Sequence, residues 1–514
     1  MRQYEVFELI LKGAEPDGSW IHVDVDAEFR LNGTVTRVRG FYMGGGEYGI
    51  RFYPDTPGKC SYIVKGAVWA EGEEEVLPAF ADSHGRVQTR GTHFAFEDKT
   101  PYLPFGTTVY AMLHQDQELM ERTFRTLAES PFNKLRLCVF PIDFLYNKNE
   151  PEDYPFEGSA GRWKVHRPCM SFWSRLEETV RRLARMQIQT DLILFHPYDH
   201  GRWGFDEMTE EQNQSYLEYL LRRLSAFPSL WWSMANEYDV CRKKVEEWYQ
   251  VEAFMAQGDP FHHLLSCHNC YKFWDMERRC ITHASLQTKL IYCVGELKRR
   301  TGKPVIVDEC CYEGNVPETW GCISGQELTR RFWRAAVSGA YCTHGEAFLD
   351  PQNIMWWTRG GILKGESVPR IAFLKKLMEE LPGPLEPIPC YVERLKKLAG
   401  ASPEEQAKAA EADPGMRMVR PFAGLGDEME LYASREAEWK GRCGDEAFLV
   451  FYDMRCYGED VLELPENRTY TLELIDVWNM TRIRLADGAT GSVRLRLPGK
   501  ENMAVLALAC TQST

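Results

Sequence analysis

The alternation of apolar and polar positions divides the chain into three stretches. Over residues 1–90, short runs such as TRVRGFYM and CSYIVKGAV alternate apolar and polar side chains, and the clusters GGGEYG and PDTPGKC separate such runs. A period of two turns one face of a strand to the core and the other to solvent, which is typical of an antiparallel β-sandwich. We therefore predict an N-terminal β-sandwich over residues 1–90.

Residues 91–384 follow a different pattern, in which short apolar runs alternate with segments of helical period. Amphipathic segments such as DQELMERTFRTLAES and NQSYLEYLLRRLSAF lie between most of the apolar runs, although the fifth crossover is too short for a full helix. Eight strands that alternate with helices over about 290 residues predict an α/β fold, a (β/α)8 TIM barrel. The eight strand candidates are 102–110, 134–140, 189–195, 230–236, 263–269, 281–287, 304–310 and 340–346.

After the helical segment 369–384 the period returns to two, in runs such as EAFLVFYDM and MAVLALA. This pattern predicts a C-terminal, sandwich-like all-β domain over residues 385–514. Within it, the polar stretch 400–414, rich in Ala and Glu, is expected to be a surface excursion.

Charge and cysteine content narrow the function classes. The 514 residues carry a net charge of −14, which argues against nucleic acid or an anionic membrane surface as a partner. The N-terminal segment lacks the apolar core of a signal peptide, and no run approaches the roughly 18 apolar residues of a membrane span. Sixteen cysteines in that context favour free thiols and a cytoplasmic location. The pattern does not decide whether the chain forms a homo-oligomer.

Two carboxylates end predicted strands of the barrel. Glu237 closes the run LWWSMANE and Glu309 closes PVIVDE, and in TIM barrels the active site forms at these carboxyl ends. Hydrolysis of a glycosidic bond needs such a pair, because one acid protonates the leaving oxygen while the other attacks or stabilises the anomeric carbon. We therefore predict a glycoside hydrolase that acts on a small oligosaccharide or glycoside and needs no cofactor.

Other polar and aromatic side chains at strand ends or on the following loops are candidate substrate contacts. Some have structural alternatives: Asn236 or Glu237 capping a helix, Arg136 serving an ion pair, and His196 bonding within its loop. Asp308 competes with Glu309, but strand alternation places Glu309 on the face of Val305 and Val307. The candidates are Asn236, Arg136, His196, His268, His283, Trp320 and Trp356.

The sequence Asn-Glu at the end of strand four, with Glu at the end of strand seven, resembles the clan of retaining (β/α)8 glycoside hydrolases that includes cellulases, mannanases and β-galactosidases. This resemblance implies that Glu237 is the acid/base, Asn236 contacts the sugar 2-hydroxyl, Glu309 is the nucleophile and Arg136 orients it. The flanking β-domains are similar to those of apiosidase-like and endoglucanase-like bacterial proteins. Strand eight departs from the clan, because it ends in His344 and Glu346 where a Trp is usual, although Trp356 or Trp357 could fold back.

Two other interpretations remain open. The first is a metal-dependent barrel hydrolase, because the imidazoles of His196, His268, His283 and His344 end predicted strands. The barrel lacks the HxH pair that opens the usual amidohydrolase type, so we expect no metal site. The second is a non-catalytic carbohydrate-binding protein on a barrel that has lost its activity, which the retention of both acids disfavours.

Overall fold

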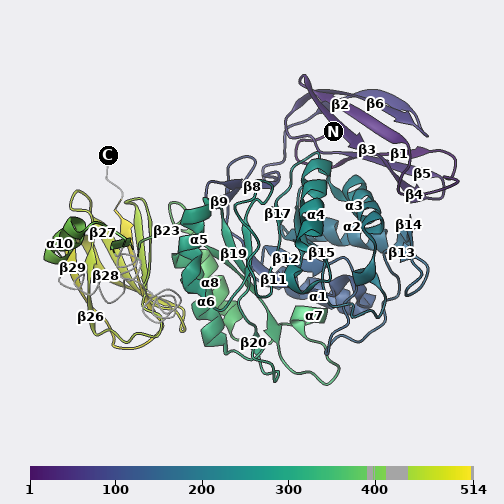
Figure 1. Ribbon diagram of the computed structural model, residues 1–514. Helices are drawn as coiled ribbons and strands as arrows, with labels where there is room; N and C mark the ends of the chain where they lie inside the picture. The colour runs from purple at the N-terminus through teal and green to yellow at the C-terminus, as the bar shows by residue number, and fades with distance from the viewer. Residues whose placement is uncertain (390–396, 399, 413–437, 511–514) are drawn as a thin grey trace. The chain divides into compact units, whose positions relative to one another are not determined.

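The computed structural model describes residues 1–389, 397–398, 400–412 and 438–510 (Figure 1). It divides into two compact units. The first unit comprises Met1–Gln287, Thr301–Cys322 and Thr343–Lys364, and the second comprises Thr288–Arg300, Ile323–Cys342 and Gly365–Thr514. The predicted division into three domains, with boundaries at residues 90 and 384, differs from these two units and stays a prediction. No helix among the described residues is both long enough and apolar enough to cross a membrane.

The N-terminal part of the first unit is a β-sandwich, as predicted. One face of β2 is buried in a regular alternation that includes Val25, Ala27, Phe29 and Leu31. Phe29 stacks on Phe52 of the other sheet, with ring centroids 4.3 Å apart, so the two sheets share a core. One sheet has the order β1 (Phe7–Lys12), β5 (Glu47–Phe52), β4 (Phe41–Gly44), and the other β3 (Thr34–Arg39), β2 (Val25–Leu31), β6 (Gly58–Gly66), β7 (Ala70–Val76).

A short antiparallel sheet leads into the barrel. It consists of β8 (Val87–Arg90), β9 (His93–Phe96) and β10 (Pro101–Tyr102). The barrel then follows as an eight-stranded sheet whose order is β17-β16-β15-β12-β11-β21-β19-β18. An isolated parallel bridge between His268 and Ser285 links the β17 and β18 sides, so the barrel is nearly closed. The strands are β11 (Phe105–Thr108), β12 (Lys134–Cys138), β15 (Gln189–Phe195), β16 (Leu230–Ala235), β17 (Leu265–Ser266), β18 (Ala284–Gln287), β19 (Val305–Glu309) and β21 (Tyr341–His344).

Each barrel strand lies within one of the eight predicted runs, which confirms the predicted fold class. Amphipathic helices connect most of them, and α2 packs on β15 while α4 packs on β16 (Figure 1). The fifth crossover, residues 267–283, contains no helix, as expected from its length. The helices are α1 (Gln117–Glu129), α2 (Met170–Arg185), α3 (Glu210–Leu224), α4 (Val245–Gly258), α5 (Val294–Thr301), α6 (Gly325–Val337), α7 (Trp356–Arg359) and α8 (Ser367–Glu379).

The loops between barrel strands and helices contain further short strands and 3-10 turns. They are β13 (Phe156–Glu157) and β14 (Lys164–Pro168), which pair with each other, β20 (Glu313–Gly314) and β22 (Glu346–Ala347), which also pair, and the 3-10 turns Met112–His114, Phe205–Glu207, Tyr238–Val240 and Ile291–Cys293.

The C-terminal part of the second unit is mainly β among its described residues, as predicted, and it also contains the helix α10 (Pro403–Ala412). Its core includes Phe448, Tyr470, Leu472 and Val505. α10 covers most of the predicted surface excursion 400–414, of which residues 413 and 414 lie outside the described residues. A six-stranded sheet has the order β23 (Glu386–Pro387), β24 (Trp439–Cys443), β25 (Ala447–Phe451), β30 (Met503–Ala509), β27 (Tyr470–Asp476), β28 (Thr481–Ala489), and β26 (Glu459–Glu463) pairs with β29 (Ser492–Arg496).

Candidate active site

Glu237 lies two residues after the end of β16, in a backbone conformation that is unusual for its residue type. Its φ is 52° and its ψ is 56°, the left-handed region that disfavours residues with a Cβ atom. Its amide donates to Nδ1 of His268 at 3.5 Å, and the amide of Tyr238 donates to the carbonyl of His268 at 2.9 Å. The chain after β17 therefore holds this turn in place.

An irregularity in β19 gives two successive carboxylates different surroundings. Leu286 of β18 pairs with Val307, but Gln287 pairs with Glu309, so the register skips Asp308. Asp308 accepts hydrogen bonds from Ser285 at 2.6 Å and from Thr343 at 2.7 Å. Glu309 instead contacts residues that end other barrel strands. The structure thus separates Asp308, which the sequence left as an alternative, from the position of Glu309.

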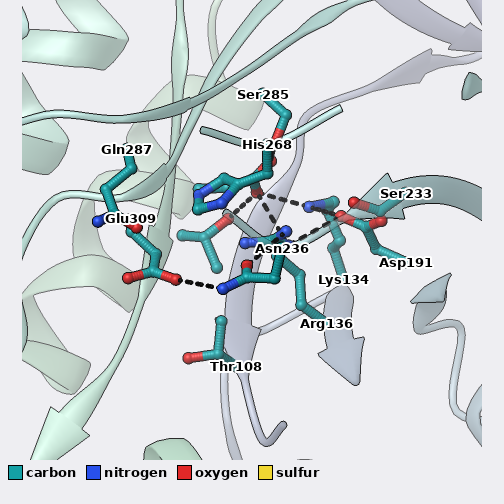
Figure 2. Close-up of polar contacts among 12 residues, drawn as sticks. Thr108, Lys134, Arg136, Asp191, Ser233, Asn236, His268, Ser285, Gln287 and Glu309 are labelled. Atoms are coloured by element: carbon teal, nitrogen blue, oxygen red, sulfur yellow. Dashed lines mark hydrogen bonds and ion pairs between the residues drawn. The ribbon is translucent and has the colours of Figure 1, made fainter. Parts of the chain in front are cut away.

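Asp308 belongs to a cluster of four buried charges inside the barrel, whose other members, Lys134, Arg136 and Asp191, are labelled in Figure 2. Lys134 lies 2.6 Å from Asp191 and 2.7 Å from Asp308, and Arg136 lies 3.3 Å from Asp191. Burial opposes the ionisation of Asp308, but Lys134 and Arg136 outweigh it and lower the pKa of that carboxyl. Two cations and two anions balance here, which makes it possible to bury all four.

Arg136 connects this cluster to residues at the carboxyl ends of the strands. Its guanidinium donates to the Asn236 side-chain oxygen at 3.3 Å and to the Tyr110 hydroxyl at 3.4 Å. Figure 2 shows the Asn236 amide between Arg136 and Glu309. Arg136 therefore serves a structural ion pair and also positions groups that contact Glu309.

Both carboxylate oxygens of Glu309 accept hydrogen bonds. The Trp320 indole donates to Oε2 at 3.1 Å, and the Asn236 amide donates to Oε1 at 3.4 Å. The Tyr110 and Tyr312 hydroxyls also donate to this carboxylate. Because N–H donors face both oxygens, the surroundings fit the ionised form of Glu309.

Glu237 has a separate set of donors. The Gln287 amide donates to its Oε1 at 3.0 Å, and the Tyr198 hydroxyl and the Cys270 thiol also bond to the carboxylate. Tyr198 accepts a hydrogen bond from Asn236 at 3.0 Å, so Asn236 connects the surroundings of the two acids.

Burial and mutual repulsion control the protonation of the two acids. Burial raises the pKa of both carboxyls, and the charge of Glu237 raises the pKa of Glu309 further. Two repelling buried carboxyls favour a state in which they share one proton. One carboxylate and one carboxylic acid that are linked through Asn236 can supply a nucleophile and a proton donor.

None of the three predicted histidines, His196, His268 and His283, hydrogen-bonds to the carboxylate of either acid in the part of the chain that the structure describes. His196 accepts a hydrogen bond from the Tyr198 amide of its own loop at 3.1 Å and thereby fixes Tyr198, and it also bonds to the carbonyl of Phe140, in the loop after β12, at 3.1 Å. His268 is fully buried and supports Glu237 through the main chain. His283 precedes β18, the end opposite Gln287, where it packs against Phe94 and Trp231. The structure therefore does not bring His283 to the two acids.

The two tryptophans of the prediction also differ. Trp320 contacts Glu309 directly. Trp356 is buried and donates to Thr107 at 2.7 Å, so it lies in the core and not with the acids. Its neighbour Trp357 instead stacks on Tyr312, with ring centroids 5.6 Å apart and planes 27° apart.

Tyr198, Tyr312 and Cys270 also contact the acids and were not predicted from the sequence. Tyr198 lies two positions after His196, and Tyr312 three positions after Glu309, both on βα loops. An aromatic residue shortly after a strand that ends in a candidate acid was the available signal.

One group among the described residues has the composition of a metal site. Nitrogen and carboxylate atoms of His344, Glu313 and Glu346 lie within 4.8 Å of one another, all buried. Glu346 also accepts a hydrogen bond from the Lys364 amide at 2.8 Å. This group does not include Glu237 or Glu309.

Comparison with known proteins agrees with this geometry. A family model described as "Apiosidase-like, catalytic domain" matches residues 88–382. Models described as domains of unknown function, DUF5060 and DUF5605, match residues 1–66 and 436–507. No curated protein matches the chain.

Among solved structures, a candidate glycoside hydrolase from Bacteroides vulgatus is 31% identical, covers 99% of both chains and superposes with a TM-score of 0.85. A glycoside hydrolase family 5 protein from the same species is 14% identical over 83% of this chain and 93% of its own, with a TM-score of 0.58. This second likeness shows the fold alone.

Proposed function

The chain belongs to the family with the apiosidase-like catalytic domain and is a glycosidase, and we propose that it cleaves its substrate with retention, through a covalent intermediate on Glu309. The observation that carries this proposal is the shared Asn236 amide. It donates to Glu309 at 3.4 Å and to Tyr198, a donor to Glu237, at 3.0 Å, so both acids face one small volume.

We propose that the proton shared by the two acids is carried by Glu237, because N–H donors face both carboxylate oxygens of Glu309. The mechanism follows from this protonation. The Glu309 carboxylate attacks the anomeric carbon while the Glu237 carboxyl gives its proton to the leaving oxygen, and the glycosidic C–O bond breaks. Glu237, now ionised, takes a proton from water, which attacks the anomeric carbon and releases Glu309. Asn236 would bind the sugar 2-hydroxyl from its place between the two acids.

The substrate we propose is a small oligosaccharide or glycoside. The aromatic surroundings of Glu309, with Tyr110, Tyr312, Trp320 and Trp357, fit a single sugar ring. The family description makes an apiofuranoside the first sugar to test. The fifteen described cysteines form no disulfide with one another, which supports the proposed cytoplasmic location. We further propose that residues 91–384 form the catalytic domain, and that residues 1–90 and 385–514 are structural.

The test is hydrolysis of aryl glycosides of apiofuranose, mannopyranose, glucopyranose and galactopyranose, in both anomeric forms. Glu309→Ala should lose kcat/KM by about four orders of magnitude or more. Glu178→Ala, which removes a surface carboxylate on α2, is the matched control and should retain full activity. Near-normal turnover by Glu309→Ala would refute the assignment of the nucleophile.

A second variant tests the acid. Glu237→Ala should lose about 100- to 10,000-fold on phenyl glycosides, yet much less on 2,4-dinitrophenyl glycosides, whose leaving group needs no proton. Equal losses on both substrates would contradict the acid role. The anomer first formed, observed by NMR, should match that of the substrate, and the opposite anomer would exclude retention.

A further inference from the structure

The loop that follows β17, residues 269–274, is attached to the structure at three points. The Asn269 side chain makes two hydrogen bonds of 3.1 Å with the main chain of Gln287. Its side-chain amide donates to the Gln287 carbonyl, and its side-chain oxygen accepts from the Gln287 N–H. The Asp239 carboxylate accepts from the amides of Cys270, Tyr271 and Lys272 at 2.6, 2.7 and 2.7 Å.

Trp274 is the third attachment. It is buried and meets Tyr238 edge-on, with ring centroids 4.8 Å apart, and Tyr249 at 5.6 Å. Asp239 and Tyr238 both belong to the 3-10 turn that starts directly after Glu237. The loop is therefore fixed to the same short segment that carries the acid.

Within this loop, Cys270 faces Glu237. Its Sγ accepts from the Gln287 amide at 3.7 Å, and its thiol donates to the Glu237 carboxylate. Burial and the Glu237 charge raise the pKa of the Cys270 thiol to about 12, so it stays protonated and keeps its donor. The loop thus contacts Glu237 through Cys270, next to the Gln287 amide.

Tyr271 is 86% exposed, the highest value among the large hydrophobic side chains that the structure describes. Its hydroxyl bonds to the Cys270 side chain, within electrostatic reach of Glu237. An anchored backbone presents this ring to solvent beside the acid, so binding a ligand there would cost little ordering of the loop.

We infer that residues 269–274 form the subsite for the leaving group, with Tyr271 as the platform on which a ring of the aglycone stacks. The inference rests on the proposed function, because the acid must lie beside the bond to the leaving group. It requires a leaving group with a flat apolar face, either an aryl ring or the face of a sugar ring.

The test uses phenyl and methyl glycosides of each sugar in the panel, together with the corresponding disaccharides. Tyr271→Ala should lower kcat/KM by about three- to ten-fold on the phenyl substrate, with little change on the methyl substrate. Tyr271→Phe keeps the ring and should restore the phenyl value. Trp69→Ala, which removes another exposed aromatic ring at 64% exposure on the N-terminal domain, is the control and should change neither. An effect on the disaccharides that matches the phenyl effect would identify a sugar as a natural leaving group, and an effect on phenyl alone would identify an aryl aglycone.

Binding of the same ligands, measured by calorimetry in the Glu309→Ala background, separates the two proposals. If Tyr271→Ala weakens binding of the phenyl ligand more than binding of the methyl ligand, the subsite is supported, even if the wild type shows no hydrolysis. A wild type that hydrolyses the panel, with Tyr271→Ala affecting phenyl and methyl substrates equally, would overturn the subsite and leave the hydrolase proposal standing. The subsite would also be overturned if Tyr271→Ala left the affinity for each of the two ligands unchanged.

Discussion

At the scale of single residues, the free energy of unfolding should decrease as Glu237 and Glu309 ionise. A carboxyl whose pKa is raised by folding binds more protons in the folded than in the unfolded protein, at pH values between its unfolded and folded pKa. The free energy of unfolding contributed by the pair therefore falls as the pH rises through that interval, because burial and repulsion raise both pKa values.

Glu309→Gln removes one of the two charges. We expect its melting temperature, relative to that of the wild type, to increase between about pH 5 and about pH 8, since two repelling acids ionise in the wild type and only Glu237 ionises in the variant. Thermal melts across this range measure the effect. Glu178→Gln, at an exposed carboxylate, should show a constant difference. A relative melting temperature of Glu309→Gln that falls with pH would contradict the raised pKa.

The proximity of the two candidate acids and their neighbours was predictable, because it depends on the positions of strand ends. Glu237, Glu309, Asn236 and Arg136 were selected as strand-end groups, and the structure joins them in one network. Tyr198 was not predictable in the same way, because its position depends on how its loop folds. The same holds for Trp356 and Trp357, since which of two neighbours turns inward is decided by contacts such as the bond from Trp356 to Thr107.

At the scale of elements, a buried ion network joins the N-terminal sandwich to the barrel within the first unit. Arg51 of β5 binds both carboxylate oxygens of Glu177 on α2, at 2.6 and 3.0 Å, and Arg223 of α3 binds the same carboxylate. Three elements that are distant in the sequence are thus connected through one side chain.

Glu177→Ala should destabilise the protein by about 3 kcal/mol, because it leaves Arg51 and Arg223 buried without their shared partner. Urea unfolding measures the change. Glu178→Ala, at the next position of the same helix, removes only an exposed ion pair with Arg185 and should cost less than about 0.5 kcal/mol. Equal effects of the two substitutions would show that the network contributes nothing specific.

Elements were predictable where the sequence pattern matched their burial. The barrel strands are buried on both faces and appear as continuous apolar runs, as in LWWSMA of β16. The strand β7, AEGEEEV, was not predicted, because it is mostly exposed and its acidic side chains show no alternation. The skipped register at Asp308 also had no signal in the sequence, since it arises from pairing with β18.

At the scale of the whole molecule, the fifteen cysteines that the structure describes form no disulfide with one another. The denatured protein should therefore titrate with about sixteen thiols per chain, the number in the sequence, with or without prior reduction. A count that rises by two or more after reduction would reveal a disulfide.

The left-handed backbone of Glu237 has a practical consequence for capturing the enzyme with its substrate. Glycine adopts this conformation without strain, so Glu237→Gly should remove the acid while melting no lower than Glu237→Ala, although glycine usually destabilises. Such a variant would retain the nucleophile and its donors but lack the proton source for poor leaving groups. It is therefore the form of choice for crystallising an uncleaved natural glycoside in place.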